Sequence, residues 1–415
     1  MQRSRNDRIA REKITLKRRA RRFTILIFGI GVCLLCLYTI WDLFDRAQLD
    51  QEAAYDKSSN TSIEQPTSQV ESDVDDNIDA QTPTTEIEVM PEQNPSEQIN
   101  LAFVGDIMMG ANVDKLLQKH GYDYPYLHIS SILQDADITA GNMENPITDR
   151  GEAIEDKSYV FRTSPMAIPD LVKSGFDVFN LANNHTLDYG LVGLQDTIRL
   201  LREAGLYGVG AGMNQEEAYE PVIIEKNGVR VAYIGLTKVV PDVSWKADKN
   251  IPGLAETYNY TRPIKAIQSA SEVSDMVVVI VHWGIEGETE ARIDERELAH
   301  RYIDAGADLV IGSHPHVLQA IESYKGKWIA YSLGNFIFTT NGKSGTNESV
   351  IIQASCSKLG DCKLNVVPVL AEYAQPKLME DEAAKVIFQH LTDISYFAEV
   401  REDGSVHPLI AESTQ

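Results

Sequence analysis

Five short polar clusters, each directly after an apolar run, carry the residue types that bind metal ions. Four of the nine histidines of the chain lie in them. Imidazole nitrogens, carboxylates and carboxamide oxygens are ordinary ligands of Mn, Fe or Zn. We interpret the clusters as parts of one metal site, which would activate water and hold a phosphoryl or carbonyl oxygen. The clusters are Val104–Asp106, Ala140–Asn145, Leu181–His185 with Asp188, Val281–Gly284 and Gly312–His316.

Each cluster also has a purely structural explanation when it is taken alone. The Gly-Asp pair ending at Asp106 is common turn chemistry, and Asn183-Asn184 could cap a helix that begins near Gly190. His282 could be a hydrogen-bonded core histidine. The pair His314-Pro315-His316 is harder to explain by packing, because proline fixes two histidines in one short loop. The metal interpretation therefore depends on all the clusters together.

The elements that must position these clusters follow from hydrophobic periodicity. From residue 99 onward, short β-rich runs alternate with helix-length amphipathic stretches, which predicts an α/β fold with a sheet covered on both faces. Such sheets bind ligands beyond the carboxyl ends of their strands, where the clusters lie. The predicted strands are 99–105, 136–141, 176–182, 229–236, 276–282 and 308–312, and the predicted helices are 112–119, 165–174, 190–204, 263–273 and 294–305.

The pattern changes after residue 312. Two strand pairs follow, 317–324 with 328–333 and 349–356 with 362–370, and then a helix over 381–393. One domain, residues 99–415, thus begins mixed and ends mainly antiparallel.

The N-terminal part predicts a membrane anchor. Residues 1–22 hold ten Lys or Arg against two acidic residues, a net charge of +8, whereas the whole chain carries −23. Residues 23–41 contain no charge, and a helix of 19 residues rises about 28 Å, close to the ~30 Å apolar core of a bilayer. The positive-inside rule places residues 1–22 in the cytoplasm and the rest outside. We therefore expect a single-pass cell-membrane protein with an extracellular main domain.

Two alternatives to an uncleaved anchor are weaker. A cleaved signal peptide would need a small-x-small site, which does not follow residue 41. A lipoprotein signal would need a small residue before Cys33 or Cys36, where Val32 and Leu35 stand. Residues 42–98 are acidic and rich in Ser, Thr, Gln and Pro, which predicts a disordered stalk.

The other two cysteines, Cys356 and Cys362, flank a turn-like stretch between two β-rich runs. Outside the membrane such a pair could close a hairpin disulfide. The alternative is two reduced thiols.

The clusters resemble, in order, the motifs of the CapA family of capsule-synthesis proteins, over about residues 99–340. That family includes the PgsA-type component of poly-γ-glutamate synthesis and belongs to the calcineurin-like metallophosphoesterase superfamily. The matching motifs are Gly105-Asp106, Asn142-x-Glu144, Asn183-Asn184-His185-x-x-Asp188-x-Gly190, His282-Trp283-Gly284, Gly312-Ser313-His314-Pro315-His316 and Tyr331-Ser-Leu-Gly-Asn-Phe336.

The resemblance implies a four-layer αββα sandwich of the metallo-dependent phosphatase type, with the site at the sheet edge. It implies that Asp106 is the first metal-binding aspartate, that Asn142 or Glu144 stands at the bridging position, and that His185 protonates a leaving group. The remaining implied ligands are Asn184, His282, His314 and His316.

This chain departs from the phosphoesterase pattern at two positions. Met108 stands where a histidine is expected, and thioether is a poor ligand for a hard, hydrolytic metal ion. Asn142 stands where the bridging carboxylate is expected, so that Glu144 must supply that charge. Both changes weaken the expectation of full phosphodiesterase activity.

Three cations in loops near the motifs, Lys157, Arg162 and Lys238, are candidates for contacts with an anionic substrate. The alternative is ordinary surface charge.

The leading functional hypothesis is a membrane-anchored component of poly-γ-glutamate or capsular polymer biosynthesis or export. Its expected partners are a membrane-bound ligase, the anionic polymer and, through residues 23–41, the membrane; no nucleic-acid partner is expected. One alternative is a surface metallohydrolase that cleaves phosphoesters or γ-glutamyl amides. Another is a scaffold with the same fold and no catalysis.

Overall fold

A computed structural model describes residues 97–155, 157–339 and 345–409. The predicted cytoplasmic tail and membrane segment, and all but the last two residues of the predicted stalk, lie outside these ranges. Within the described residues, no helix combines the length and the apolar character of a membrane span.

The first sheet has eight strands. Its order is β16-β15-β14-β1-β2-β3-β4, and β13 pairs with β1 in parallel. β1 runs parallel to β2 and antiparallel to β14, so this sheet is mixed. Its strands are β1 (Gln98–Ile107), β2 (Ile138–Met143), β3 (Val178–Asn180), β4 (Tyr207–Val209), β13 (Asn335–Ile337), β14 (Glu348–Ser357), β15 (Cys362–Glu372) and β16 (Gln375–Leu378).

The second sheet has six strands in the order β11-β12-β10-β9-β7-β6. Its centre is parallel, and the two edge strands are antiparallel to their neighbours. Its strands are β6 (Val222–Lys226), β7 (Val229–Thr237), β9 (Met276–His282), β10 (Leu309–Ser313), β11 (Ile321–Tyr324) and β12 (Lys327–Ala330).

Two small antiparallel ribbons complete the strand structure of the described residues. One pairs β5 (Ala211–Gly212) with β8 (Gly253–Leu254), and the other pairs β17 (Ala398–Val400) with β18 (Val406–Pro408).

Alternating side chains of the central strands bury both faces of each sheet. In β9, Met276, Val278 and Ile280 pack into the core between the sheets, whereas Val277 and Val279 face the helices outside. A strand that is buried on both faces reads as a continuous apolar run, because successive side chains point to opposite sides. For this reason the apolar runs in the sequence predict β1 and β9 correctly.

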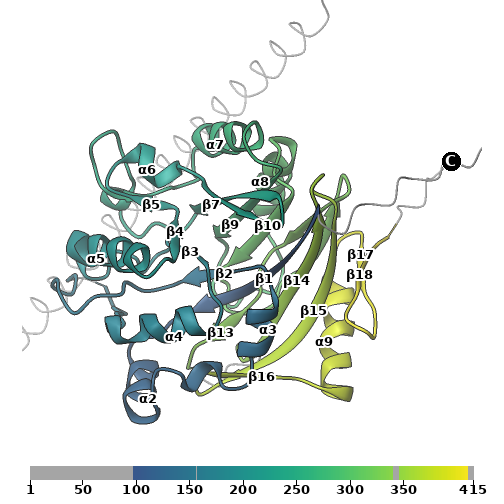
Figure 1. The fold of residues 1–415 in the computed structure, drawn as a ribbon, viewed down its shortest axis with the longest axis horizontal. Coiled ribbons are helices and arrows are strands. Elements are labelled where there is room, and N and C mark those ends of the chain that lie inside the picture. Colours follow the sequence, from purple (N-terminus) through teal and green to yellow (C-terminus); the bar gives the residue numbers. More distant parts are fainter. Residues whose placement is uncertain (1–96, 156, 340–344, 410–415) are drawn as a thin grey trace, which may run out of the picture. The chain divides into compact units, whose positions relative to one another are not determined.

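Helices cover the outer face of each sheet, which gives the order helices, sheet, sheet, helices (Figure 1). The first sheet packs against α2 (Asn112–His120), α3 (Ser130–Asp135), α4 (Ile168–Lys173) and α5 (Gly190–Glu203). The second sheet packs against α6 (Gln215–Tyr219), α7 (Thr261–Ser271) and α8 (Ile293–Asp304). The helix α9 (Asp381–Ile394) adds apolar side chains to the core between the sheets.

The mixed α/β class is confirmed, and several expectations need correction. The alternation predicted one sheet with helices on both faces, whereas each sheet here has helices on one face and the other sheet on its second face. The strand predicted over 176–182 is only β3, and the helix predicted over 165–174 divides into the short 3₁₀ helix η3 (Pro165–Ala167) and α4. The pair predicted over 317–333 is shorter, since β11 begins at Ile321 and β12 ends at Ala330.

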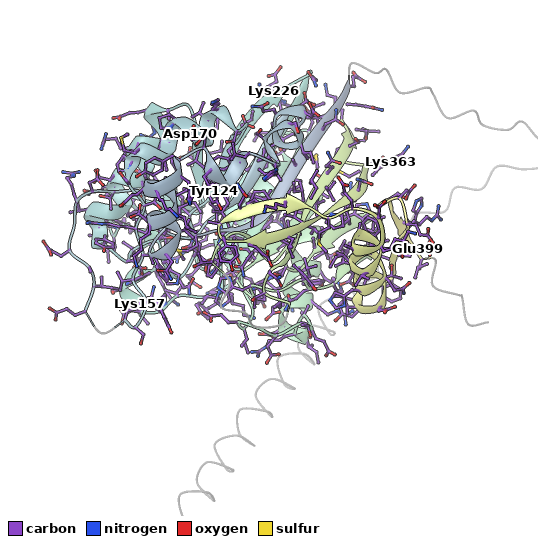
Figure 2. All side chains as sticks on the ribbon, turned by 90° about the horizontal axis from the view of Figure 1, so that it is seen from below. Tyr124, Lys157, Asp170, Lys226, Lys363 and Glu399 are labelled. Atoms are coloured by element: carbon purple, nitrogen blue, oxygen red, sulfur yellow. A yellow bond between two sulfur atoms is a disulfide. The ribbon has the colours of Figure 1, made fainter. Side chains whose placement is uncertain are left out.

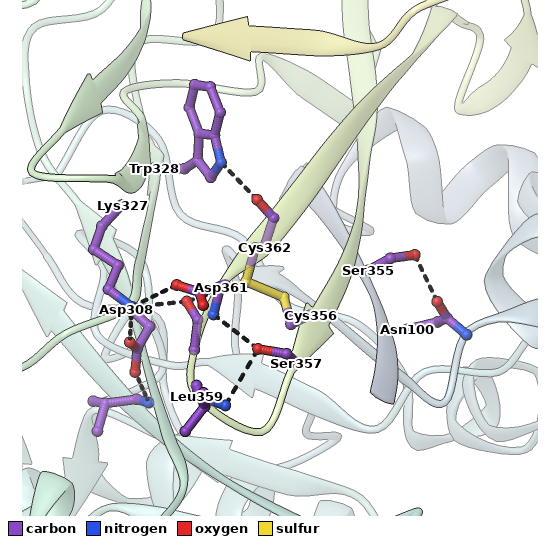
Figure 3. Close-up of a disulfide and its surroundings, with 12 residues drawn as sticks. Asn100, Asp308, Lys327, Trp328, Ser355, Cys356, Ser357, Leu359, Asp361 and Cys362 are labelled. Atoms are coloured by element: carbon purple, nitrogen blue, oxygen red, sulfur yellow. Dashed lines mark hydrogen bonds and ion pairs between the residues drawn. A yellow bond between two sulfur atoms is a disulfide. The ribbon is translucent and has the colours of Figure 1, made fainter. Parts of the chain in front are cut away.

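A disulfide joins Cys356 and Cys362 across the hairpin of β14 and β15 (Figure 3). The hairpin tip is held to the second sheet, because Lys327 Nζ donates to the Gly360 carbonyl at 2.9 Å. Trp328 Nε1 also donates to the Cys362 carbonyl at 2.9 Å. The tip therefore links the two sheets near the start of β1, where Ile99 pairs with Cys356.

Candidate metal centre

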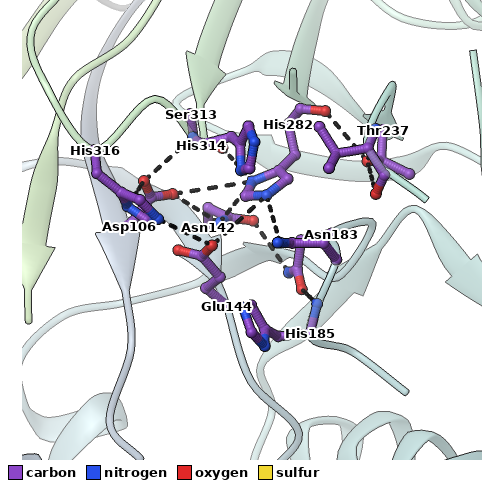
Figure 4. Close-up of polar contacts among 12 residues, drawn as sticks. Asp106, Asn142, Glu144, Asn183, His185, Thr237, His282, Ser313, His314 and His316 are labelled. Carbon is purple, nitrogen blue, oxygen red and sulfur yellow. Dashed lines mark hydrogen bonds and ion pairs between the residues drawn. The ribbon is translucent and has the colours of Figure 1, made fainter. Parts of the chain in front are cut away.

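The carboxyl ends of four parallel strands bring the predicted site together. Asp106 near the end of β1 is paired with Asn142 of β2, and His282 at the end of β9 is paired with Ser313 of β10. Glu144 follows β2 directly. The strand ends thus deliver side chains from both sheets to one cluster (Figure 4).

Asp106 is fully buried and both of its oxygens have partners. Oδ1 accepts a hydrogen bond from Asn142 Nδ2 at 2.8 Å, and Oδ2 accepts one from the His314 backbone N–H at 3.2 Å. Oδ2 also lies 3.1 Å from His316 Nδ1. The carboxylate therefore points at the His-Pro-His loop.

Glu144 is also fully buried, but neither of its carboxylate oxygens has a hydrogen-bond partner among the described residues. Its Oε1 lies 3.7 Å from Nε2 of His282 and 3.7 Å from Nε2 of His316. Burial raises the pKa of Glu144 well above its ordinary value, and the nearby Asp106 raises it further. Burying a carboxylate without a partner is costly, and a bound cation would offset that cost.

The His282 side chain contacts residues that come from both sheets. Its Nε2 lies 2.9 Å from Asn184 Oδ1, and its Nδ1 lies 3.1 Å from Ser313 Oγ. Burial lowers its pKa well below the ordinary value, and the neighbouring histidines lower it further. The ring is therefore neutral, the state in which imidazole binds a metal ion.

The His-Pro-His loop presents two imidazoles from left-handed backbone conformations. The φ angles of His314 and His316 are 100° and 59°, values that non-glycine residues rarely adopt. The ring centroid of His314 lies 4.6 Å from that of His282. The Nδ1 of His314 is buried without a hydrogen-bond partner in the described structure. The strained loop thus aims both imidazoles inward.

The two histidines of this loop have opposite pKa shifts. Burial, and then the neighbouring His316, lower the pKa of His314 to about 3. Burial acts in the same direction on His316, but the carboxylates of Glu144 and Asp106 outweigh it and raise its pKa to about 10. His316 and Glu144 thus both favour their protonated forms, and a proton held among His316, Glu144 and Asp106 offsets the buried negative charge in the protein alone.

Two sets of three ligand atoms come within 4.8 Å of one another, and Glu144 belongs to both. One set is Glu144, His314 and His316, and the other is Asp106, Glu144 and His282. Nitrogen and carboxylate donors in this mixture suit a divalent ion such as Mn, Fe or Zn. The donor set and the unpartnered atoms of Glu144 and His314 therefore fit a metal ion.

Asn142, which the resemblance placed at the bridging position, uses both ends of its carboxamide within the protein. Its Nδ2 donates to Asp106, and its Oδ1 lies 3.3 Å from the amide nitrogens of Asn180 and Asn183. Glu144 is the carboxylate that faces the histidines, whereas Asn142 holds Asp106 in place.

His185 lies at the edge of the cluster and is largely buried (Figure 4). Its Nδ1 lies 2.7 Å from Asp188 Oδ2, and the Phe161 ring packs on it with centroids 4.8 Å apart. Burial lowers its pKa, against the opposing effect of Asp188.

The three predicted substrate cations have different surroundings. Lys157, labelled in Figure 2, lies with its Nζ 2.5 Å from Asp188 Oδ1 and 3.0 Å from His185 Nδ1. Lys238 pairs with Asp294 at 2.5 Å. Arg162 lies over the ring of Tyr189, 4.5 Å from its centroid. The structure thus brings Lys157 to the edge of the cluster, whereas Lys238 and Arg162 have other partners.

Sequence reasoning left out three residues that hold the site. Asn335 Oδ1 lies 2.9 Å from His316 Nδ1 and can accept a hydrogen bond from it. Asn180 contacts Asn142, and Ser313 contacts His282. Asn335 lies within the Tyr331–Phe336 motif and Ser313 within the Gly312–His316 motif, and these motifs were the available signals. Nothing in the sequence singled out Asn180.

The comparisons with known proteins agree on one family. A family model described as bacterial capsule synthesis protein PGA_cap matches residues 100–340. The PGA biosynthesis protein CapA of Bacillus subtilis (strain 168) is 37% identical over 317 residues, 74% of this chain and 81% of that protein. The capsule biosynthesis protein CapA of Bacillus anthracis is 37% identical over 289 residues, 68% of this chain and 70% of that protein.

Two solved structures are similar at lower identity. A hypothetical protein from Thermus thermophilus is 18% identical with a TM-score of 0.38, covering 67% of this chain and 96% of that chain. The 5'-nucleotidase of Candida albicans SC5314 is 13% identical with a TM-score of 0.37, covering 66% of this chain and 53% of that chain.

Proposed function

The chain belongs to the bacterial capsule synthesis protein family PGA_cap, and we propose that it is a membrane-anchored, extracytoplasmic component of poly-γ-glutamate capsule assembly with a divalent metal centre. The name of the Bacillus subtilis relative, a PGA biosynthesis protein, supports the polymer, and the name of the Bacillus anthracis relative supports a role in capsule biosynthesis. The buried cluster of carboxylates and imidazoles supports the metal.

The residues that would hold the ion are those whose donor atoms converge on Glu144. They are Asp106, Glu144, His282, His314 and His316. Asn184, whose Oδ1 lies 2.9 Å from His282 Nε2, is a further candidate ligand. A bound divalent ion would act as a Lewis acid toward a carboxylate, carbonyl or phosphoryl oxygen. Asn142 and Asn335 would keep Asp106 and His316 in position.

One observation carries this proposal: the Glu144 carboxylate is buried among imidazoles with no hydrogen-bond donor in the described structure. The test is the metal content of the purified full-length chain, measured by inductively coupled plasma mass spectrometry. We expect near-stoichiometric Mn, Fe or Zn, and a loss of it in Glu144→Ala and His316→Ala. His390→Ala, on α9, is the matched control and should keep the metal. A folded wild-type protein without metal would contradict the proposal.

The N-terminal part of the proposal rests on the sequence. Residues 1–22 would lie in the cytoplasm, residues 23–41 would span the membrane, and residues 42–98 would form the stalk of the outer domain. A net charge of −23 for the whole chain means that a polyanion is repelled by most of the molecule. Polymer would therefore bind locally at the metal centre, beside a membrane-bound ligase.

A second candidate function is a surface metallohydrolase that acts on phosphoesters or γ-glutamyl amides. The position of His185 favours it, because Nδ1 is fixed by Asp188 and Nε2 has no hydrogen bond among the described residues. A ring held in this way is suited to transfer a proton to a leaving group. Metal-dependent turnover of a model ester, lost in His185→Ala, would support this function. Metal-loaded protein without turnover would favour a binding role in assembly.

A further inference from the structure

The segment between β2 and η3 is fastened beside His185. Residues 150–155 and 157–161, which we term the strap, have three attachments to Asp188. The Ile154 N–H donates to the Asp188 carbonyl at 3.0 Å, and the Phe161 N–H donates to Asp188 Oδ2 at 2.8 Å. Lys157 forms the third attachment, 2.5 Å from Asp188 Oδ1. Two of these three attachments therefore use the buried carboxylate of Asp188.

The same carboxylate fixes the His185 ring. Asp188 Oδ2 lies 2.7 Å from His185 Nδ1, and the Asp188 N–H donates to the His185 carbonyl at 3.0 Å. Asp188 is fully buried. It thus joins the strap on one side to His185 on the other.

The Lys157 ammonium has two protein acceptors, Asp188 Oδ1 and the Asn184 carbonyl, each at 2.5 Å. His185 Nδ1 lies 3.0 Å from the ammonium, but it donates its own proton to Asp188 and therefore does not accept from Lys157. The Lys157 side chain is 18% exposed, and the ammonium lies 5.3 Å from the centre of the Trp245 ring. An ammonium that is mostly buried and donates to two acceptors inside the protein is fixed in place beside His185 and is poorly placed to meet an anionic substrate.

We propose that Lys157 is a positioning residue for His185. Through Asp188 it closes the strap over the ring and holds Nδ1, so that Nε2 remains directed to the proposed metal centre. This reassigns Lys157 from the substrate contact that its sequence position suggested. The importance of the orientation rests on the proposed metal centre, whereas the closure of the strap can be tested separately.

The test is hydroxyl-radical footprinting of the full-length chain, with the oxidation rate of His185 read by mass spectrometry. Loss of the charge-assisted bonds of Lys157 should raise the population of the locally open state about tenfold. In the Lys157→Met variant, His185 and Phe161 should therefore be oxidised faster than in the wild type. Lys238→Met is the matched control, because Lys238 is 22% exposed and paired with Asp294; it should match the wild type.

A double-mutant cycle separates positioning from general loosening of the fold. Because Lys157 acts through Asp188, Asp188→Asn should also speed the oxidation, and the double variant should be no faster than the faster single variant. Lys157→Gln, which keeps a hydrogen-bond donor, should give an intermediate rate and serves if Lys157→Met does not fold. Wild-type rates in both Lys157 variants, or effects that multiply in the double variant, would overturn the proposal.

Metal content, measured on the same samples, keeps the two proposals apart. A metal-free wild type with a fast Lys157→Met variant would refute the metal centre and leave the closure intact. A metal-loaded wild type with an unchanged Lys157→Met variant would refute the closure alone.

Discussion

The carboxyl group of Glu144 and the carboxamide of Asn142 divide the tasks that the family resemblance assigned to one bridging residue. Asn142 donates to Asp106 and is itself held by Asn180 and Asn183. Glu144, two residues later, is the group without a hydrogen-bond partner among the described residues. The carboxylate is therefore at Glu144, in the loop after β2, and not at position 142 in the strand, and it still faces the histidines.

Glu144 should therefore destabilise the metal-free protein. Glu144→Leu removes a buried carboxyl group without a donor, so the free energy of unfolding in EDTA should rise by about 1–3 kcal/mol. Mn²⁺ at a hundredfold excess over its Kd should stabilise the wild type by about 2.7 kcal/mol and the variant not at all. Urea unfolding with EDTA and with Mn²⁺ measures both. A variant that is still stabilised by Mn²⁺ would remove Glu144 from the site.

The ligand residues could be predicted from the sequence, because their types are unusual after apolar runs. The residues that orient them could not. The contacts of Lys157 join positions 27 to 31 residues apart, and a lysine in a polar loop gives no sign of such contacts. Likewise, no pattern shows that His314 and His316 adopt left-handed backbone angles.

At the scale of elements, the sequence predicted the strands that are buried on both faces, whereas it did not predict the edge strands β4, β6 and β16, and it predicted the edge strand β11 too long. β9 is a continuous apolar run, whereas β6 at the sheet edge mixes exposed and buried positions. The short strands β4, β17 and β18 contain three residues each. Strands this short form by pairing with neighbouring strands, and the local sequence pattern does not show which strands those are. The division into two facing sheets came from the family resemblance and not from periodicity.

The helix α5 is joined through Asp196 to the first residue of the strap, Arg150, and to Thr148 just before it. The Asp196 carboxylate accepts from Arg150 Nε at 2.9 Å and from Thr148 Oγ1 at 2.7 Å. The Arg150 hydrogen bond is the main cause that lowers the pKa of Asp196. A lowered pKa in the folded state adds stability above the ordinary carboxyl pKa, and this stability is lost as the pH falls through the folded value.

Asp196→Asn should therefore be less stable than the wild type at pH 7, by about 1 kcal/mol, since the exposed Arg150 is screened by solvent. The difference should shrink below about pH 4, where carboxyl groups of the unfolded chain are protonated. Urea unfolding at pH 7 and pH 3 measures it. A difference that grows toward acid pH would contradict this assignment.

The disulfide should stabilise the hairpin of β14 and β15 without affecting the metal centre. Cys356 pairs with Ile99 at the start of β1, whereas Asp106 stands near its end. Replacing both cysteines by serine opens a short loop, which should cost about 2 kcal/mol of unfolding free energy. Metal content should be unchanged. Loss of metal in the double variant would show that the two ends of β1 are coupled.

At the scale of the whole molecule, charge separates two parts of the chain. Residues 1–22 carry ten basic and two acidic residues, so a total of −23 leaves −31 for the rest. The proposed topology places these opposite charges on opposite sides of the membrane. An anionic polymer would then leave a surface that repels it, and bind only where the metal centre attracts it.

Deletion of residues 1–41 should move the protein from the membrane fraction to the soluble fraction, because the 19 uncharged and mostly apolar residues 23–41 have the length of a membrane span. Cell fractionation with immunoblotting measures this. Deletion of residues 42–88 is the matched control and should leave the protein in the membrane. Retention of the 1–41 deletion in the membrane fraction would show that another part of the chain binds there.

The most direct test of the account is an anomalous difference map from crystals of the protein grown with Mn²⁺. The account predicts one or more peaks within coordination distance of Glu144, bounded by Asp106, His282, His314 and His316, at the carboxyl ends of β1, β2, β9 and β10. A map without a peak there, with Glu144 instead satisfied by protein or solvent hydrogen bonds, would contradict it.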